Sequence, residues 1–360
     1  MRKTTVLLTC IGGTFVPDTI EALRADPDLD LRIVGVDANP EVANRFLVDS
    51  FHVVPGAAAA PDRFLDTLRE ICHAEEVEVV LPSADEEVVA LARVKSEFRE
   101  SGVRCAVEES GTVDLLRDKA RLFARLAERG VPLPGFALVS VPDQIEEAAR
   151  SLGYPGRKIV LKPPTGRGSR GLVVVDPAVQ GFHPVSGARH AFADLASVVE
   201  QVERERGRLP LLAMEFMPGP DYDVDCIARQ GEALCVVPRR RLWKDPFLSV
   251  SQGCRIERHP GLEEFTRRIV RELSLSHAMD LDVGLGAGGA PGLYEINPRW
   301  SGAVAASRAG GVNVPAILLR TLLDLPVPAV EPKHGTRMFP VTRMAFVDEA
   351  SPRSLRVRDS

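Results

Sequence analysis

The segment Gly292–Gly302, "GLYEINPRWSG", begins like a buried strand and ends in a dense group of polar side chains. Successive side chains of a strand point to opposite faces, so Glu295 and Asn297 share one face while Tyr294 and Ile296 share the other. The two oxygen-bearing side chains are therefore within reach of a single cation. Mg²⁺ in proteins prefers oxygen ligands, commonly one or two carboxylates together with phosphate oxygens. The segment thus predicts a metal site at the end of a strand.

The residues around this strand end strengthen the metal interpretation. Pro298 stiffens the exit from the strand, and Arg299 follows it as a cation suited to a phosphoryl group in transfer. Residues 279–298, "MDLDVGLGAGGAPGLYEINP", are typical of a hairpin around a Gly/Pro turn. Asp282 would then lie across from Glu295 and add a second carboxylate. A merely solvated strand end would explain the acid, but not the acid, amide and arginine together.

A second motif is the glycine pattern G-x-G-x-x-G in "LKPPTGRGSRGLVVV", formed by Gly166, Gly168 and Gly171. A strand follows this pattern instead of a helix, so no helix N-terminus is available to hold the pyrophosphate of a dinucleotide. The context favours a flexible hairpin loop folded over a triphosphate, with Ser169 and Arg170 as additional donors. Lys162, on the strand before the loop, would place an ammonium group on the phosphates. An ordinary mobile hairpin is the alternative.

A third glycine-containing stretch lies near the N-terminus, where a predicted strand leads into Gly12 and Gly13 and then into a helix. Asp37, at the end of the next strand, imitates the ribose-binding acid of a nicotinamide-binding fold. The glycines do not form G-x-G-x-x-G, however, and Phe15 and Val16 fill the space that a close phosphate contact needs. We therefore interpret this stretch as a structural or substrate-binding loop between a strand and a helix.

The chain as a whole has two kinds of secondary-structure pattern. Up to about residue 110, apolar strands (4–10, 31–38, 77–83 and 103–108) alternate with amphipathic helices (17–27, 61–76 and 85–102). This alternation predicts an α/β domain with a doubly wound parallel sheet. One helix is then expected from Thr112 to a glycine cap at Gly130. From Lys158 onward the pattern consists mainly of strands, with a few intervening helices.

Composition limits the class of protein. The chain has 360 residues, of which 45% are hydrophobic and 26% charged, and its net charge of −5 argues against a general nucleic-acid binder. Apolar runs stay shorter than the ~20 residues that a membrane span requires. The six cysteines include no CxxC pair, which favours reduced thiols over a disulfide scaffold or a zinc site. The sequence therefore predicts a cytoplasmic protein that binds neither nucleic acid nor membrane.

These motifs, taken in order, resemble the ATP-grasp superfamily, in particular its carbamoyl-phosphate synthase large-subunit and carboxylate–amine ligase branch. The segment "RDKARLFARLAERGVPLP" is similar to the family's opening helix, whose lysine, here Lys119, contacts the nucleotide phosphates. The segment "KPPTGRGSRG" resembles the phosphate-covering loop with its lysine, Lys162. The segment "YEINPRWSG" resembles the metal-binding signature, which makes Glu295 and Asn297 metal ligands and gives Asp282 a third ligand position.

The resemblance also implies where the nucleoside binds. The segment "MEFMPGPDYDVD" is similar to the hinge between the two lobes of the fold, where the adenine-binding backbone would be that of Glu215, Phe216 and Met217. Asp221 takes the place of the family's ribose-binding glutamate, and its shorter side chain leaves Asp223 as a rival. The segment "VVPRRR" resembles a basic strand near the phosphates, so Arg239 and Arg241 are candidates there.

The implied domain organisation is a Rossmann-like pre-ATP-grasp domain followed by a two-part α+β ATP-grasp fold. The expected boundaries are 1–110 for the first domain, 111–325 for the ATP-grasp domain (lobes 111–210 and 211–325), and 326–360 for a C-terminal strand and tail. Asp85, at a strand end of the first domain, is either a substrate contact or a helix N-cap. His277, just before the metal-bearing hairpin, is either functional or structural.

The chemistry implied by the resemblance is that ATP phosphorylates a small carboxylate and an amine then attacks the acyl phosphate. Arg299, Lys162 and Arg241 are the expected catalytic residues. The expected cofactors are ATP and Mg²⁺, with Mn²⁺ as the alternative metal. The identities of the carboxylate and the amine stay open, as does a homodimeric state. Alternative functions are a carboxyphosphate-forming carboxylase or carbamoylating enzyme, a non-catalytic ATP-binding regulator and, more distantly, a nicotinamide oxidoreductase.

Overall fold

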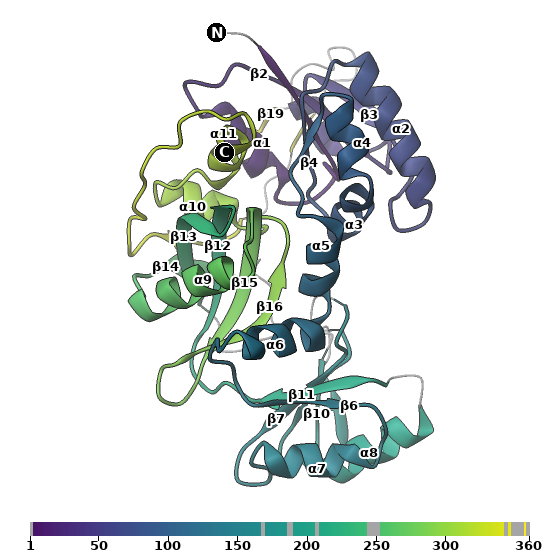
Figure 1. The fold of residues 1–360 in the computed structure, drawn as a ribbon, viewed down its shortest axis with the longest axis vertical. Coiled ribbons are helices and arrows are strands. Elements are labelled where there is room, and N and C mark those ends of the chain that lie inside the picture. The colour runs from purple at the N-terminus through teal and green to yellow at the C-terminus, as the bar shows by residue number, and fades with distance from the viewer. Residues whose placement is uncertain are drawn as a thin grey trace.

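The computed structural model describes residues 3–166, 170–185, 190–205, 209–242 and 253–341, together with two short strands at 345–346 and 356–357. The described chain has three parts (Figure 1). An N-terminal α/β domain lies beside the second lobe of an ATP-grasp-like fold, and the first lobe lies at the far end of the molecule. Within the described residues, no helix is long and apolar enough to cross a membrane.

The N-terminal domain is a parallel sheet of five strands in the order β3-β2-β1-β4-β5. Its strands are β1 (Thr4–Leu8), β2 (Leu31–Asp37), β3 (Ser50–Val53), β4 (Val79–Leu81) and β5 (Arg104–Cys105). Alternate residues of β1 pack into different cores, Val6 and Leu8 on one face and Leu7 on the other, so both faces are covered. The predicted doubly wound parallel sheet is confirmed. The sequence did not indicate β3, which is only partly buried and lacks a continuous apolar run.

The helices of this domain are α1 (Val16–Arg24), α2 (Pro61–Ala74), α3 (Asp85–Arg93) and α4 (Lys95–Glu100), with a short 3-10 helix η1 (Ala43–Leu47). The single helix expected over 85–102 is two helices, because Val94 leaves helical geometry with φ −119° and ψ 16°. The expectation that Asp85 caps this helix was wrong. Ala84 occupies the N-cap position, and its amide donates to the Glu87 carboxylate at 3.2 Å.

The first lobe has a six-stranded sheet in the order β6-β11-β7-β8-β10-β9. Its strands are β6 (Phe136–Val139), β7 (Ile159–Lys162), β8 (Leu172–Val175), β9 (Phe182–Pro184), β10 (His190–Ala193) and β11 (Leu211–Glu215). Two helices, α7 (Gln144–Ser151) and α8 (Leu195–Arg204), pack against this sheet around a common apolar core. Because β11 pairs with β6 and β7, this lobe extends beyond residue 210, where the sequence placed its end.

Two consecutive helices, α5 (Ser110–Arg117) and α6 (Lys119–Glu128), connect the N-terminal domain to the first lobe. The sequence predicted one continuous helix here. The break falls at Asp118, whose carboxylate accepts hydrogen bonds from the amides of Ala120 and Arg121 at 3.1 Å and thereby caps α6. This break places Lys119 on the first turn of a new helix, where its side chain is buried.

The second lobe is an antiparallel sheet of six strands in the order β16-β15-β12-β13-β14-β17. Its strands are β12 (Asp221–Arg229), β13 (Glu232–Arg241), β14 (Cys254–Ile256), β15 (His277–Leu285), β16 (Pro291–Asn297) and β17 (Arg337–Met338). Helix α9 (Pro260–Glu272) packs on one face of the sheet. Helices α10 (Val304–Ala309) and α11 (Val314–Leu322) pack on the other face, in a core shared with β1 and α1.

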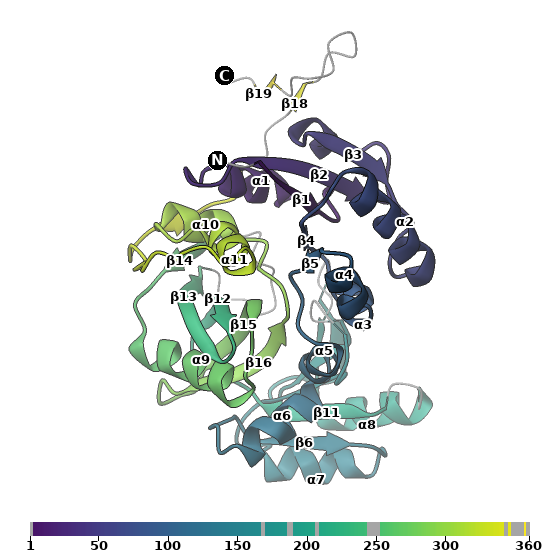
Figure 2. The same cartoon turned by 45° about the horizontal axis from the view of Figure 1, so that its top comes forward.

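The N-terminal domain and the second lobe are joined by polar contacts as well as by this shared core. Arg320 of α11 donates to Asp26 and Asp28, each at 2.6 Å. Asn313 donates to the carbonyl of Ala22 at 2.7 Å. Figure 2 shows these two parts side by side, with the first lobe at the opposite end and β18 (Ala345–Phe346) and β19 (Arg356–Val357) beyond the N-terminal domain. The N-terminal domain and the second lobe therefore form one packed unit, which borders the space between the two lobes on one side.

Candidate active site

The metal-binding hairpin predicted from the sequence is formed by β15 and β16. Asp282 is paired directly with Glu295, and Asp280 with Asn297, so the acids and the amide lie on adjacent strands. A register shift after Asp282 leaves one extra residue, Tyr294, in β16. The expected convergence of Asp282 and Glu295 is thus confirmed by the strand register.

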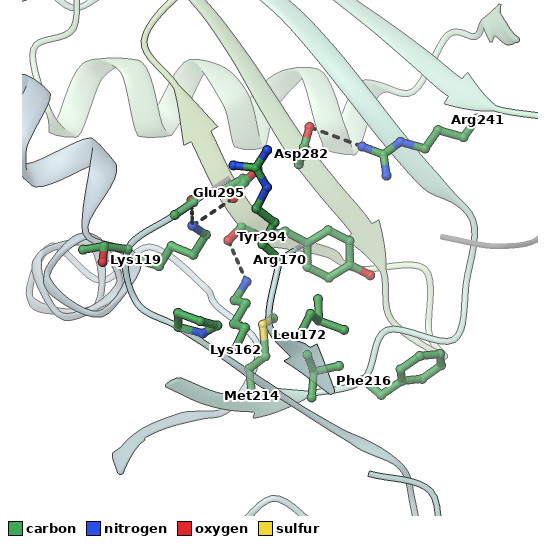
Figure 3. Close-up of a pocket in the computed structure, with 14 residues that line it drawn as sticks. Lys119, Lys162, Arg170, Leu172, Met214, Phe216, Arg241, Asp282, Tyr294 and Glu295 are labelled. Atoms are coloured by element: carbon green, nitrogen blue, oxygen red, sulfur yellow. Dashed lines mark hydrogen bonds and ion pairs between the residues drawn. The ribbon is translucent and has the colours of Figure 1, made fainter. Parts of the chain in front are cut away.

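Two lysines from the first lobe reach this strand end (Figure 3). The Lys119 ammonium lies 3.0 Å from the Glu295 carboxylate and donates to the carbonyl of Gly166 at 2.8 Å. The Lys162 ammonium donates to the backbone carbonyl of Tyr294 at 2.9 Å. Burial, and next the charge of Lys119, lower the pKa of Lys162 to about 7. Two ammonium groups in one buried region are suited to a polyanionic ligand.

The acids of the site are held by opposite charges. Burial opposes ionisation of Glu295, but Lys119 and Lys162 together keep its pKa below its ordinary value. Burial raises the pKa of Asp282 well above its ordinary value, although Arg241 lies 3.3 Å away and acts in the other direction. The pKa values of these two carboxyl groups shift in opposite directions because Glu295 faces Lys119 and Lys162, whereas Asp282 lies among other aspartates.

A cavity of about 660 Å³ lies between the two lobes. One part of its lining is apolar and the other is charged. The apolar part includes Val160, Leu172, Met214 and Phe216, and the charged part includes Lys119, Lys162, Arg170, Arg241, Asp282 and Glu295. An apolar slot that ends in cations and carboxylates matches a nucleotide, with a flat base at one end and phosphates at the other.

A second cavity adjoins the first and opens toward the N-terminal domain. The two cavities share four residues, namely Lys119, Gly166, Arg170 and Glu295. The second is also lined by Asp85, Glu86, Arg117 and Asn297. A small molecule in this second cavity would therefore lie next to the charged end of the first. Glu86 and Arg117 were not singled out from the sequence, because both belong to segments that read as ordinary amphipathic helices.

The glycine loop of the sequence analysis borders both cavities. Gly166 (φ +118°) and Gly171 (φ +76°) adopt backbone conformations that favour glycine, and Arg170 lines both cavities. Gly168 and Ser169 lie outside the described residues. The described part of the loop thus lies where a phosphate-covering segment was expected.

The hinge residues lie at the apolar end of the first cavity. Phe216 lines the cavity, whereas Met217 is buried beneath it. The Glu215 carboxylate accepts from the Gly135 amide at 2.9 Å and lies 3.0 Å from Arg157. Glu215 is thereby held by its side chain, while the backbone that follows it runs along the cavity.

The two candidates for the ribose-binding acid have different surroundings. Asp221 accepts a hydrogen bond from the Tyr294 hydroxyl at 3.0 Å, and Tyr294 lines the nucleotide cavity. Asp223 is completely buried, and the Arg241 guanidinium donates to it at 2.5 Å. Gly284 makes room for the tyrosine, because a Cβ there would lie 2.2 Å from the Tyr294 hydroxyl oxygen. Asp221 is thus linked through Tyr294 to the wall of the nucleotide cavity, whereas Asp223 is held by Arg241.

Arg239, a candidate for phosphate binding, lies behind the site. Its side chain is fully buried, and its guanidinium donates to Asp225 at 3.0 Å and to Ser301 at 2.8 Å. His277 is also remote from both cavities. It is half-buried and begins β15 with φ +63°, and desolvation lowers its pKa to about 4. Among the described residues, this arrangement favours structural positions for both side chains.

Arg299 lies on the side of the strand end that faces the N-terminal domain. Its guanidinium is 2.8 Å from the Asp85 carboxylate and 4.0 Å from Asp280. Asp85 lines the second cavity, but Arg299 lines neither. From the sequence, Arg299 was expected at the phosphoryl group and Asp85 was either a substrate contact or a helix cap, and no pattern indicated that the two would pair across a domain boundary.

The donor set at the strand end fits Mg²⁺. Asp282 and Glu295 supply carboxylate oxygens from directly paired positions. The Asn297 amide donates its Nδ2 to the carbonyl of Asp280 at 3.3 Å, which turns its carbonyl oxygen to the other side. Two carboxylates and an amide oxygen beside a phosphate-sized cationic cavity match the preference of Mg²⁺ for a few protein oxygens plus phosphate oxygens.

The N-terminal glycine stretch is closed to a ligand. The Gly12 amide donates to the Asp37 carboxylate at 2.7 Å. A Cβ at Gly12 would lie 2.6 Å from Val42, so side chains already occupy the space above the loop. The structural interpretation of this loop is therefore supported over dinucleotide binding.

Two family models match the chain. The family described as "ATP-grasp in the biosynthetic pathway with Ter operon" matches residues 208–344. The family described as "PylC-like, N-terminal domain" matches residues 8–106. The chain therefore contains an ATP-grasp domain and a PylC-like N-terminal domain. Its PylC-like domain corresponds to the parallel-sheet domain, and the resemblance inferred from the motifs is confirmed.

Individual relatives are distant. The arginine-specific carbamoyl phosphate synthase large chain of Bacillus subtilis is 22% identical over 244 residues, which cover 64% of this chain and 22% of that protein. The L-amino acid ligase of Bacillus licheniformis has a TM-score of 0.64 at 16% identity, with 90% of this chain and 75% of that chain covered. The N5-carboxyaminoimidazole synthase of Aspergillus clavatus, solved with ADP, has a TM-score of 0.66 at 17% identity, with coverage of 91% and 78%. The chain thus spans about a fifth of the length of the curated synthases. The likeness to the solved structures concerns the fold.

Proposed function

We propose that this protein is an ATP-dependent ligase that activates a small carboxylate as an acyl phosphate and transfers the acyl group to an amine. ADP and phosphate would be the other products. The observation that carries the proposal is the meeting of Lys119 and Lys162 from one lobe with Asp282 and Glu295 from the other, around a single cavity. That combination fits a nucleoside triphosphate with divalent cations. A simple anion site would not need the two acids, and a simple cation site would not need the two lysines.

The nucleotide would bind with its base in the apolar part of the cavity, between Met214 and Leu172 and along the backbone near Phe216. We assign the ribose to Asp221, because Asp223 is fully buried and bonded to Arg241. The phosphates would lie against Lys119 and Lys162, beneath the glycine loop. A bound triphosphate would restore the charge of Lys162, since nearby anions raise the pKa of an ammonium group.

Phosphoryl transfer needs charge neutralisation and positioning more than acid–base groups. Asp282, Glu295 and Asn297 would hold Mg²⁺, which supplies charge neutralisation of the phosphates when bound. A carboxylate oxygen of the substrate attacks the γ-phosphorus, and the bond from that phosphorus to the ADP oxygen breaks. Lys119 and Lys162 would stabilise the charge on the transferred group, and Arg241 would orient Asp282.

The second cavity is the proposed site of the carboxylate and the amine. The amine nitrogen attacks the acyl carbon, the bond from that carbon to the phosphate oxygen breaks, and the amine loses a proton. Asp85 is positioned at this cavity by Arg299, whose guanidinium is 2.8 Å away. Arg299 would act through Asp85 and the strand end, and not by touching the phosphoryl group. The glycine loop would exclude water, because an exposed acyl phosphate hydrolyses.

A phosphate-release screen tests the proposal. Purified protein with ATP and Mg²⁺ would be offered amino acids and small carboxylic acids one at a time, each with and without hydroxylamine. An acyl phosphate intermediate converts hydroxylamine to a hydroxamate, so a cognate acid should give both ADP and a hydroxamate. Bicarbonate serves as a parallel substrate for the carboxyphosphate alternative. Release of AMP and pyrophosphate, in place of ADP and phosphate, would contradict the proposal.

A further inference from the structure

A further groove lies apart from the two cavities of the candidate active site. It runs between the connecting helices α5 and α6 and the C-terminal end of α9, and it encloses about 800 Å³. Among the described residues, none that lines it also lines either of the two cavities. We refer to this groove as the arginine pocket; its lining residues are Gly111, Thr112, Leu115, Arg121, Arg125, Arg129, Arg271, Glu272, Leu273 and Ser274.

Four guanidinium groups reach the arginine pocket from two walls. Arg121 and Arg125 lie on α6, Arg129 is the C-cap residue of that helix, and Arg271 lies on α9. All four residues are exposed. The three arginines of α6 follow one another at intervals of four residues, so their side chains share one face of the helix. Guanidinium groups on facing walls are suited to a ligand with several anionic oxygens.

Acids do not balance the positive charge of the arginine pocket. Glu272 is the one acid among its lining residues, and Glu128 lies 3.4 Å from Arg125. Four arginines against these two glutamates leave two positive charges. Within the part of the chain that the structure describes, the other three arginines form no ion pair. This excess is local, because the chain as a whole has a net charge of −5.

Helix stabilisation does not account for all of these arginines. A cation is favourable in the last turn of a helix, where Arg125 of α6 and Arg271 of α9 lie. Arg121, by contrast, lies in the first turn of α6, where the helix macrodipole disfavours a positive charge. An arginine at the unfavourable end of a helix, beside three further cations, indicates a site for an anion.

The N-terminus of α5 adds backbone donors to the arginine pocket. Gly111 and Thr112 of its first turn line the pocket, and the N-cap residue Glu109 makes no side-chain capping hydrogen bond to the described residues. A Cβ built at Gly111 would meet no atom within 4 Å, so the space beside this backbone is open. The amides of a helix N-terminus carry partial positive charge and bind phosphate oxygens. The helix end and the arginines therefore favour the same class of ligand.

We propose that the arginine pocket binds a small molecule that carries two or more phosphate groups. Guanidinium groups pair bidentately with phosphate oxygens, and a ligand with two phosphates can reach the arginines of both walls at once. This site goes beyond the proposed ligase activity and requires neither ATP nor a metal ion. Because α6 also carries Lys119, the ligand would contact the same helix that reaches the nucleotide cavity.

The experiment measures the binding of pyrophosphate to nucleotide-free and metal-free protein by isothermal titration calorimetry. Arg121→Ala combined with Arg271→Ala removes one guanidinium group from each wall. We expect this variant to lose about tenfold or more in affinity, because charge-assisted hydrogen bonds are the strong ones. Binding by the wild type should also weaken as the ionic strength rises. The matched control, Arg150→Ala with Arg204→Ala, removes the same charge from exposed helices of the first lobe and should leave the affinity unchanged.

The nucleotide cavity is a second place where pyrophosphate can bind, and Lys162→Ala separates the two sites. Lys162 lines the nucleotide cavity and not the arginine pocket. The binding that depends on Arg121 and Arg271 should therefore persist in Lys162→Ala. Citrate carries carboxylates in place of phosphates, and we expect it to bind the wild type more weakly than pyrophosphate does.

Four results would overturn the inference: no pyrophosphate binding by folded wild type, equal binding by wild type and the Arg121 and Arg271 double variant, loss of all binding in Lys162→Ala, and tighter binding of citrate than of pyrophosphate. Circular dichroism verifies the fold of each variant. If the double variant fails to fold, Arg129→Ala takes its place with the same direction of effect, because Arg129 is exposed at the end of α6. No ATP turnover is measured, so this test is separate from the test of the ligase proposal.

Discussion

The glycine loops at Gly12 and at Gly166 both follow a buried strand, but their surroundings differ. In the N-terminal loop, the Gly12 amide is already bonded to Asp37 and the space above it is filled by Val42. In the loop after β7, Gly166 and Arg170 line a cavity that two buried lysines also line. The difference lies in the surroundings: a carboxylate accepts from the Gly12 amide in the first loop, whereas two buried ammonium groups lie beside Gly166 in the second.

This comparison teaches that a glycine pattern identifies a phosphate site only together with its surroundings. A phosphate loop needs free backbone donors and positive charge within reach. The loop at Gly12 has a carboxylate where a phosphate would bind, and like charges there would repel. In the loop at Gly166, the Gly166 carbonyl accepts from the Lys119 ammonium, which also pairs with Glu295 and so connects the loop to the strand that carries the proposed metal ligands.

The largest expected effect comes from removing the proposed metal ligands on β16, the strand that Lys119 connects to the loop at Gly166. Glu295→Ala combined with Asn297→Ala should lower ATP turnover by about a thousandfold or more, since loss of even one preorganised electrostatic group costs about 10²–10³ in rate. The measurement is phosphate release with the cognate substrate. The fold should persist, as judged by circular dichroism. Turnover at the parental rate would remove the metal assignment.

The next effect concerns the lysine beside the loop. Lys162→Ala should weaken ADP binding by about tenfold to a hundredfold, because a charge-assisted hydrogen bond contributes about 1.5–3 kcal/mol. Isothermal titration gives the affinity. Lys95→Ala is the control, because its ammonium pairs with Glu109 of the N-terminal domain at 2.8 Å and lines neither cavity. Equal losses in both variants would contradict the interpretation of the loop.

A substitution in the N-terminal loop should separate stability from nucleotide binding. Gly12→Ala would place a methyl group 2.6 Å from Val42 and 2.9 Å from Asp37. Overpacking of this kind costs about 1–3 kcal/mol of unfolding free energy, measurable by urea denaturation. The ADP affinity of the folded variant should match that of the wild type. A variant that keeps its stability but loses nucleotide binding would move the nucleotide to the N-terminal domain.

The smallest effect is a pH dependence at the base of the same N-terminal loop. Burial raises the pKa of Glu87, which accepts a hydrogen bond from Thr9, to about 7. The folded protein therefore binds a proton that the unfolded chain releases near pH 4.5, so this group lowers stability as pH rises from about 4.5 to about 7. In Glu87→Gln, which cannot ionise, this fall of the unfolding free energy between pH 4.5 and pH 7 should largely disappear. An unchanged slope would contradict the buried, protonated state of Glu87.

Much of the fold could be predicted from the sequence, because it depends on local patterns. The continuous apolar strands of the N-terminal domain and the hairpin around Gly286–Gly289 each have a periodic or turn signal. The break at Asp118 was missed, because the residues on both sides of it fit one helical period. The strands β9, β10 and β14 were also missed, since they are short and gain their stability from neighbours in the sheet.

The candidate site was predictable where its residues lie on one element and less so where they meet across elements. The alternation of side chains in a strand places Glu295 and Asn297 on one face, and hairpin pairing brings in Asp282. The family resemblance added Lys119 and Lys162. No local sequence pattern shows that these two lysines approach the strand end from elsewhere in the fold. The contact between Arg299 and Asp85 depends on how a separate domain packs, so the sequence could not reveal it.

A crystal structure of the protein with ADP and Mn²⁺ tests the central claim most directly, because Mn²⁺ is located by its anomalous scattering. We predict an anomalous peak bridging the nucleotide phosphates and the carboxylates of Asp282 and Glu295, at ligand distances of about 2.1 Å. Lys162 should contact the same phosphates. A nucleotide bound against Gly12, or manganese with no contact to residues 282, 295 and 297, would contradict the account.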